Sequence, residues 1–231
     1  LNLKKRANCI WQAKKPKWKY AKTAQCSTAR LQSKMFEQIK DKRVLITGAS
    51  SGIGKETANI FFGYGAHIGL NSKTISSWHG KGGGKIGLFK GNLLQSDVRK
   101  NLIFSFVEKF GGIDILINNA GSCNTYKHFL EIDEESWDEM FDLHTKAPFM
   151  LSKEAFKHMQ KQNWGRIINI STAAIEHAGP NNMHYYTSKA AMEAFTNGFA
   201  KMGAKYNILV NSIRCGVIDT PMRKKVAGYS E

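Results

Sequence analysis

Tyr185 and Lys189 are the two side chains in this sequence best suited to moving a proton. They are four residues apart in a run that predicts a helix, so they share one helix face. An ammonium beside a phenol favours the phenolate, and we expect Lys189 to draw the pKa of Tyr185 down from about 10. Such a group is an effective proton donor and acceptor. Because this spacing also arises by chance, its meaning depends on the rest of the sequence.

A glycine-rich turn far upstream supplies a second chemical feature. The run Thr47-Gly-Ala-Ser-Ser-Gly-Ile-Gly54 follows a short apolar segment and precedes a helical pattern. Glycines let the backbone turn tightly and approach a pyrophosphate, which then lies at the helix N-terminus. The alternative is a glycine-rich turn that binds nothing. The candidate contacts to the cofactor here are Gly48, Ser50, Ser51, Gly52, Ile53 and Gly54.

The elements that must position these residues alternate between strand and helix. Predicted strands cover residues 43–47, 66–70, 85–89, 113–117, 166–170 and 208–213. Predicted helices cover residues 53–62, 96–110, 133–160 and 185–205, and Pro148 should kink or break the third. Residues 76–84 are too rich in glycine for a helix. Apolar strands joined by helices indicate an α/β fold, a doubly wound parallel sheet with helices on both faces.

Composition narrows the class of protein. The chain has 231 residues, enough for one such domain. It has no apolar run near the roughly 20 residues that span a membrane. Its four cysteines are scattered, which is typical of free thiols in a reducing compartment. The seven histidines show no ligand spacing, so we expect no metal site.

The net charge of +16 is concentrated in the leading segment, residues 1–40. There 11 Lys and Arg face only Glu37, which leaves +6 for residues 41–231. The leading segment can be a disordered or non-native tail, a targeting peptide, or an arm that binds nucleic acid. We therefore divide the chain into a basic segment, 1–40, and a nucleotide-binding domain, 41–231.

Taken together, these motifs resemble the short-chain dehydrogenase/reductase family in its single-domain form. The match covers Thr-Gly-x-x-x-Gly-x-Gly at residues 47–54, Asn-Asn-Ala-Gly at 118–121 and Tyr-x-x-x-Lys at 185–189. A fourth match is Val210 to Ile213 followed by Gly216 to Thr220. The resemblance implies a Rossmann fold and hydride transfer between NAD(P) and a carbonyl or secondary alcohol. It also implies that Tyr185 exchanges the substrate proton and that Lys189 holds the nicotinamide ribose.

The resemblance also implies further contacts to the cofactor. Leu93 belongs to this set, and so does Asn92, which stands where the family often has an acidic residue near the adenine. The remaining members are Asn119, Ala120, Gly121, Ile218 and Thr220, together with Tyr185 and Lys189. The family's Pro-Gly after the sixth strand is Cys215-Gly216 in this chain, which can loosen the segment that covers the cofactor.

Two catalytic positions depart from the family pattern. The serine expected thirteen residues before Tyr185 is Thr172, and Ser171 comes one residue earlier. Because neighbouring residues on a strand point to opposite faces, either Thr172 substitutes or a longer loop presents Ser171. The asparagine expected seven residues after Trp137 is His144. His144 can relay protons, or it can be a buried histidine whose hydrogen bonds are satisfied.

The choice of cofactor depends on the end of the second strand. No carboxylate follows it to bind the ribose hydroxyls of NAD, whereas Lys73 can face a 2′-phosphate. We therefore predict NADP over NAD. A solvated lysine is the alternative interpretation of Lys73.

Three functions compete at this point. The first is the oxidoreductase, with a small-molecule carbonyl or alcohol substrate, no membrane or nucleic-acid partner, and a cytoplasmic location unless residues 1–40 direct import into an organelle. The second is a truncated or degraded relative that at most binds nucleotide. The third is a nucleic-acid-associated protein. The family usually continues past the equivalent of Glu231 into a last helix and a seventh strand, and we expect this chain to lack both. A complete C-terminus would predict a homo-oligomer.

Overall fold

The computed structural model describes residues 36–123 and 127–223. The chain divides into two units, Leu1–Phe36 and Glu37–Glu231, and every element below belongs to the second. The predictions made for residues 1–35 lie outside the described residues.

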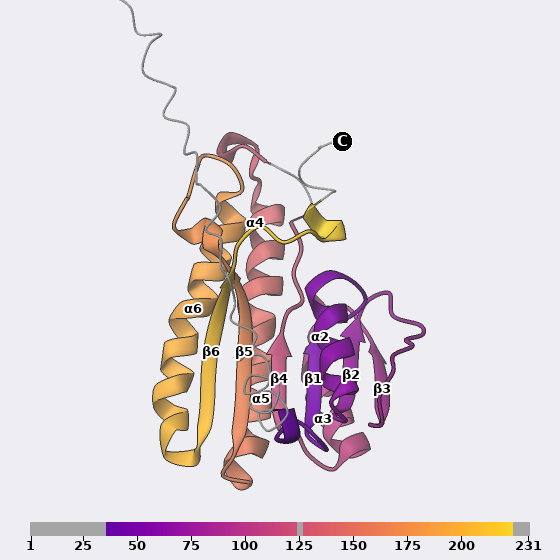
Figure 1. Ribbon diagram of the computed structural model, residues 1–231. Helices are drawn as coiled ribbons and strands as arrows, with labels where there is room; N and C mark the ends of the chain where they lie inside the picture. The colour runs from indigo at the N-terminus through magenta and orange to yellow at the C-terminus, as the bar shows by residue number, and fades with distance from the viewer. Residues whose placement is uncertain (1–35, 124–126, 224–231) are drawn as a thin grey trace, which may run out of the picture. The chain divides into compact units, whose positions relative to one another are not determined.

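The second unit is built on a six-stranded parallel sheet with strand order β3-β2-β1-β4-β5-β6 (Figure 1). The order reverses between β1 and β4, and in sheets of this kind ligands bind at such a point, beyond the carboxyl ends of the strands. This confirms the doubly wound Rossmann fold. The strands are β1 (Arg43–Thr47), β2 (His67–Ser72), β3 (Ile86–Lys90), β4 (Ile115–Asn118), β5 (Gly165–Thr172) and β6 (Ile208–Cys215).

Helices cover both faces of this sheet (Figure 1). The α-helices are α2 (Gly52–Gly63), α3 (Ser96–Phe110), α4 (Glu134–Phe141), α5 (Ala147–Lys161) and α6 (Met183–Gly203). A π-helical segment, η2 (Asp142–Lys146), joins α4 to α5. Short 3₁₀ turns are η1 (Phe129–Glu131), η3 (Ala173–Ile175) and η4 (Ala204–Tyr206).

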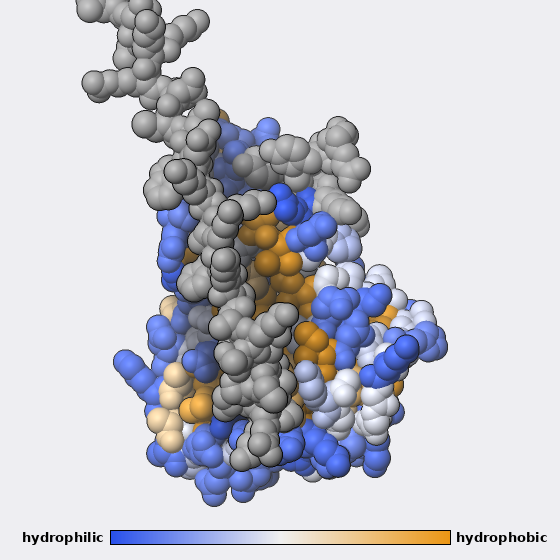
Figure 2. Space-filling view, viewed as in Figure 1, coloured by the Kyte–Doolittle hydropathy of each residue, from blue (hydrophilic) through white to orange (hydrophobic). Residues whose placement is uncertain are grey.

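The alternation of side chains along the strands creates two apolar cores. On β1, Leu45 faces the core shared with α3 and α5, whereas Val44 and Ile46 face the core shared with α2. All three side chains are fully buried. Within the described residues β6 pairs only with β5, and its Leu209 and Ile213 remain about half exposed. Apolar side chains are accordingly visible over the middle of the face shown in Figure 2.

The helix predicted over residues 133–160 is interrupted earlier than expected. The interruption is the π-helical turn η2, which ends two residues before Pro148. Proline lacks the N–H that an α-helix would use to bond the carbonyl one turn back, so the regular hydrogen-bond ladder cannot run through this segment. His144 lies inside this irregular turn and is fully buried.

The segment between β2 and β3 is a loop, as its glycines predict. All of its residues are described, and none is helical. Trp78 from this loop packs edge-on against Phe62 of α2, with ring centroids 5.3 Å apart. One aromatic side chain thus covers part of the apolar surface that a crossover helix would otherwise cover.

Candidate active site

The glycine-rich turn joins β1 to α2 with a backbone that excludes side chains. Gly48 and Gly52 have φ angles of 64° and 53°, in the left-handed region that favours glycine. A Cβ on Gly48 would lie 2.7 Å from the Ala120 Cα, and one on Gly54 would lie 2.4 Å from the Gly48 carbonyl oxygen. The N-cap residue Ser51 forms no side-chain cap to the first turn of α2. This leaves a narrow turn and a helix N-terminus suited to a pyrophosphate.

Asn119 fastens the loop after β4 to this turn. Its amide nitrogen Nδ2 donates to the carbonyls of Thr47 and Gly48, at 2.9 and 3.1 Å. The Thr47 hydroxyl accepts from the backbone N–H groups of Asn119 and Ala120, both at 3.0 Å. Sequence reasoning did not assign Thr47 a role, although its place at the end of β1, opposite the Asn-Asn motif, was the available signal.

The segment after β6 returns to the glycine-rich turn at the carboxyl ends of the strands. Its Thr220 methyl group lies 3.3 Å from the position that a Cβ on Gly52 would occupy. Ile218 is about half exposed. The structure therefore brings Thr220 next to the glycine turn, and these residues fit a dinucleotide cofactor.

Tyr185 and Thr172 are hydrogen-bonded to each other through their side chains. Burial raises the pKa of the Tyr185 phenol above its usual range, and the bond to Thr172 offsets this only in part. The expectation that Lys189 would lower the pKa of Tyr185 is therefore wrong, because burial outweighs the effect that lowers it. The phenol carries its proton at neutral pH.

Lys189 is buried beneath the site. Its ammonium donates to the carbonyl oxygen of Ile170 at 2.7 Å, and only 4% of the residue is exposed. Burial lowers the pKa of Lys189 to about 8. Because the same burial penalises the ammonium and the phenolate, both groups are pushed towards their neutral forms.

Ser171 does not share the site with Thr172. Its hydroxyl donates to the carboxylate of Glu193 on α6. Of the two hydroxyls that the sequence left open, the structure therefore places Thr172 beside the phenol.

His144 is held on both ring nitrogens. Its Nε2 accepts from the backbone N–H of Ser122, so the proton is on Nδ1, which donates to the Ser188 hydroxyl; both bonds measure 3.0 Å. Ser188 in turn donates to the carbonyl oxygen of Tyr185. Burial, with the charges of Lys189 and His184, holds the pKa of His144 well below its usual range. This geometry favours the satisfied buried histidine over the proton relay.

The candidate residues near the adenine side lie at the ends of β2 and β3. Ser50 accepts a hydrogen bond from Ser72 at 2.9 Å, and Lys73 is exposed just after β2. The side-chain oxygen of Asn92 accepts from the backbone N–H of Leu94. Leu93 is buried, and its carbonyl accepts from Arg99. No described residue at the end of β2 supplies a carboxylate.

Asn182 is a further residue that the sequence analysis missed. It adopts a left-handed conformation, with φ 56°, immediately before α6. Its side chain accepts from the backbone N–H of Lys127 at 2.9 Å and donates to the Cys123 sulfur at 3.4 Å. It therefore ties the loop after β4 to the helix that carries Tyr185. Asparagine tolerates this conformation better than most residues, which was the available signal.

A cavity of about 570 Å³ is lined by residues of α4, η2, α5 and α6, none of which is among the site residues named above. We assign the site to the carboxyl ends of the strands instead, because Tyr185, Lys189 and His144, whose pKa values are altered, gather there. No three His, Cys, Asp or Glu residues within 36–123 and 127–223 are grouped so that they could hold a metal ion. The cavity is lined by Trp137, Asp138, Phe141, Asp142, Thr145, Lys146, Phe149 and Phe195.

Comparison with known proteins places the chain in a family. The family model for short chain dehydrogenase matches residues 42–229. The 3-oxoacyl-(acyl-carrier-protein) reductase FabG of Thermotoga maritima is 32% identical, over 82% of this chain and 79% of that protein. Dehydrogenase/reductase SDR family member 4 of Caenorhabditis elegans is 31% identical, over 80% of this chain and 74% of that protein.

Solved structures agree with this placement. An NADH-dependent reductase, A1-R′, complexed with NAD superimposes with a TM-score of 0.73 at 30% identity, covering 79% of this chain and 81% of that one. An NAD⁺-bound xylitol dehydrogenase superimposes with a TM-score of 0.70 at 27% identity, covering 77% and 71%. The chain belongs to the short-chain dehydrogenase/reductase family and is an NAD(P)-dependent oxidoreductase by that membership. No helix in the described parts of the chain is long and apolar enough to cross a membrane.

Proposed function

We propose that this protein interconverts a carbonyl compound and a secondary alcohol, with Tyr185 as the proton donor and acceptor. The observation that carries the proposal is the phenol of Tyr185, bonded to Thr172 at the carboxyl edge of the sheet. Lys189 lies one helical turn further along α6. The glycine turn and Thr220 at the same edge fit the cofactor.

In this proposal the chemistry is divided between cofactor and protein. The nicotinamide, when bound, supplies or accepts the hydride. Tyr185 carries its proton at neutral pH and can donate it to a carbonyl oxygen. Alcohol oxidation needs the phenolate instead, so we expect it to be favoured at alkaline pH. Thr172 orients the phenol, and Lys189 is placed to interact with the ribose.

Replacing Tyr185 by Phe tests the proposal. We expect turnover on a panel of carbonyl substrates to fall by about 10²–10⁴-fold, because the general acid is lost. Cofactor affinity should stay within about threefold of wild type, since the ring is retained. Tyr186→Phe is the matched control, because its hydroxyl bonds only the Gly179 carbonyl at 2.9 Å.

Two results would contradict the assignment of Tyr185. One is full activity in Tyr185→Phe. The other is cofactor binding by the wild type without turnover on any carbonyl or alcohol, which would favour a non-catalytic relative that only binds nucleotide.

We also infer a preference for NADP over NAD. The support is the exposed Lys73 after β2 and the absence of a carboxylate among the residues that end this strand, Asn71 and Ser72. The two solved relatives named above are complexes with NAD, so the preference separates this chain from them. We expect Lys73→Glu to weaken NADP binding about tenfold without weakening NAD binding, because the new carboxylate can accept from the ribose hydroxyls of NAD. Tighter binding of NAD than of NADP by the wild type, measured by fluorescence titration, would reject this inference.

A further inference from the structure

We propose that Glu193 and Arg214 are positioning residues that act through Ser171 and the end of β6 to hold Thr172 against Tyr185. The inference rests on the function proposed above. It concerns a polar cluster outside the family motifs, formed by Ser171 on β5, Glu193 on α6 and Arg214 on β6.

The contacts of Glu193 join three elements at one carboxylate. Ser171 donates to its Oε1 at 2.5 Å. Arg214 donates through Nε at 2.9 Å to Oε1 and through a terminal nitrogen at 2.7 Å to Oε2. A guanidinium that binds both oxygens fixes direction as well as distance. The Glu193 side chain is only 14% exposed, so its place between the strands and the helix is well defined.

The strand register links this cluster to the reacting group. Ser171 pairs with Arg214, and the next pair is Thr172 with Cys215. Because neighbouring residues on a strand point to opposite faces, fixing the first pair towards α6 also fixes the orientation of the second. Thr172 then reaches the Tyr185 phenol, and Cys215 lies close enough to interact electrostatically with Tyr185 and Lys189.

Helix α6 contacts the end of β5 at three successive residues. Lys189 binds the Ile170 carbonyl, Glu193 binds the Ser171 hydroxyl, and Tyr185 binds the Thr172 hydroxyl. The three α6 residues are spaced four apart, so they form one stripe along the helix. Glu193 is thus the third member of a stripe whose other two members are the proposed catalytic pair.

The cluster is charged at neutral pH. The hydrogen bond from Arg214 lowers the pKa of Glu193, and the bond from Ser171 adds to this effect. Arg214 also forms an ion pair with Glu176, at the end of η3. The Glu176 side chain is 60% exposed and binds Arg214 rather than Ser171, which makes it a useful control.

The test compares Glu193→Gln with Glu176→Gln in the full chain. Glutamine keeps the shape of each glutamate side chain but removes the negative charge that faces Arg214. In Glu193→Gln we expect kcat to fall about tenfold with little change in KM for the cofactor or the substrate. Both ligands still bind, but Thr172 and Tyr185 are misaligned for the reaction. The alkaline rise of alcohol oxidation should move to higher pH, since the bond from Thr172 lowers the pKa of Tyr185. Glu176→Gln should resemble wild type in both respects.

A second readout does not depend on turnover. Iodoacetamide labelling, followed by peptide mass spectrometry, reports how often the end of β6 opens at Cys215. We expect labelling of Cys215 to accelerate about fivefold in Glu193→Gln, with Cys123 as the internal reference, and to be unchanged in Glu176→Gln. Ser171→Ala removes only the hydroxyl and should shift kcat and labelling in the same direction by about threefold, which covers the case in which Glu193→Gln does not fold.

The outcomes separate the two proposals. The positioning role is overturned if Cys215 is labelled at the same rate in Glu193→Gln and Ser171→Ala as in Glu176→Gln. This holds whether or not the enzyme turns over. A normal kcat and pH profile in an active Glu193→Gln enzyme overturns it as well. Wild-type protein without Tyr185-dependent turnover, but with faster Cys215 labelling in Glu193→Gln, overturns the proposed function and retains the positioning of β6 by Glu193.

Discussion

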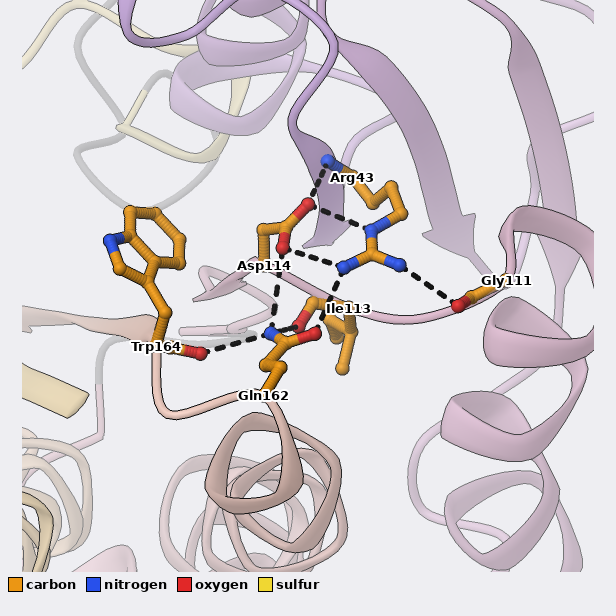
Figure 3. A network of polar contacts seen from close by, with 6 residues as sticks. All are labelled: Arg43, Gly111, Ile113, Asp114, Gln162 and Trp164. Carbon is orange, nitrogen blue, oxygen red and sulfur yellow. Dashed lines mark hydrogen bonds and ion pairs between the residues drawn. The ribbon is translucent and has the colours of Figure 1, made fainter. Parts of the chain in front are cut away.

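The amino ends of the strands and the Tyr185–Lys189 pair at the carboxyl ends treat charge in opposite ways. At the amino ends of the strands, Arg43 and Asp114 form a fully paired network with Gln162 (Figure 3). At the carboxyl ends, Tyr185 and Lys189 are buried, and besides burial their pKa values are shaped by the Thr172 hydroxyl and the thiols of Cys123 and Cys215.

The amino-end network stabilises charged forms. Asp114 accepts from the Arg43 backbone N–H at 2.8 Å and from its guanidinium at 2.8 and 2.7 Å. Gln162 donates to the carbonyls of Ile113 and Trp164 and accepts from Arg43. Burial alone would raise the pKa of Asp114, but the bonds and charge of Arg43 outweigh it and the pKa is lowered.

The surroundings of Tyr185 and Lys189 favour neutral forms, because burial raises the pKa of Tyr185 and lowers that of Lys189. Paired charges hold the strands together, whereas unpaired titratable groups can respond to a ligand. The comparison therefore predicts that changes at the amino end alter stability and that changes at the carboxyl end alter turnover and pH dependence.

Lys189→Met should produce the largest change in the pH dependence of stability. Below pH 8 the folded protein keeps a buried ammonium that the unfolded chain solvates, and this cost disappears as pH rises from about 8 to 10.5. The wild type should therefore gain about 3 kcal/mol relative to Lys189→Met across that window. Urea denaturation at several pH values measures the difference.

The control for this experiment is Lys201→Met, a replacement of an exposed lysine on the same helix. Its stability should run parallel to wild type across the same pH range. A constant gap between wild type and Lys189→Met would show that the lysine is not buried as a charge, and the contrast between the two ends would fail.

Asp114→Asn tests the amino end and should have the next largest effect. It leaves the guanidinium of Arg43 without its charged partner, and we expect a loss of about 2 kcal/mol. The side chain of Arg43 is 24% exposed, so the effect should be smaller than for a fully buried pair. Because the pKa of Asp114 is lowered in the folded state, the loss should be present at neutral pH and disappear as pH falls below about 4.

Turnover per folded molecule should stay within about twofold of wild type in Asp114→Asn, since the network lies at the other end of the sheet. Asp138→Asn, at an exposed position, should change neither stability nor turnover. A fall in kcat as large as that of an active-site variant would show that the two ends are coupled.

Much of this architecture could be predicted from the sequence because it depends on local patterns. Apolar strand runs, the glycine turn and the Tyr185–Lys189 spacing each have a local signature. The direction of the Tyr185 pKa shift could not be predicted, because it depends on burial by segments distant in sequence. The contact of Arg43 with Asp114 spans 71 residues and has no local signature.

The choice between Ser171 and Thr172 shows the same limit. Strand alternation predicts that the two hydroxyls point apart, but it does not predict which one meets Tyr185. That depends on where α6 begins and on Glu193. This residue lies 22 positions after Ser171 and accepts a hydrogen bond from its hydroxyl.

Ser188→Ala should have the smallest effect. It tests whether a residue next to the reacting groups contributes to stability or to turnover. Ser188 is buried at the carboxyl end, yet it bonds His144 and the backbone carbonyl of Tyr185 rather than the phenol. Its loss strands the His144 Nδ1 proton, which should cost about 1 kcal/mol of stability and change kcat by less than about threefold. In a His144→Leu background the same substitution should cost almost nothing, because the Nδ1 donor that Ser188 accepts from is already absent. If kcat instead falls with no loss of stability, Ser188 belongs with the reacting groups. The residues that bond the backbone of Tyr185 would then affect turnover as well as those that bond its phenol.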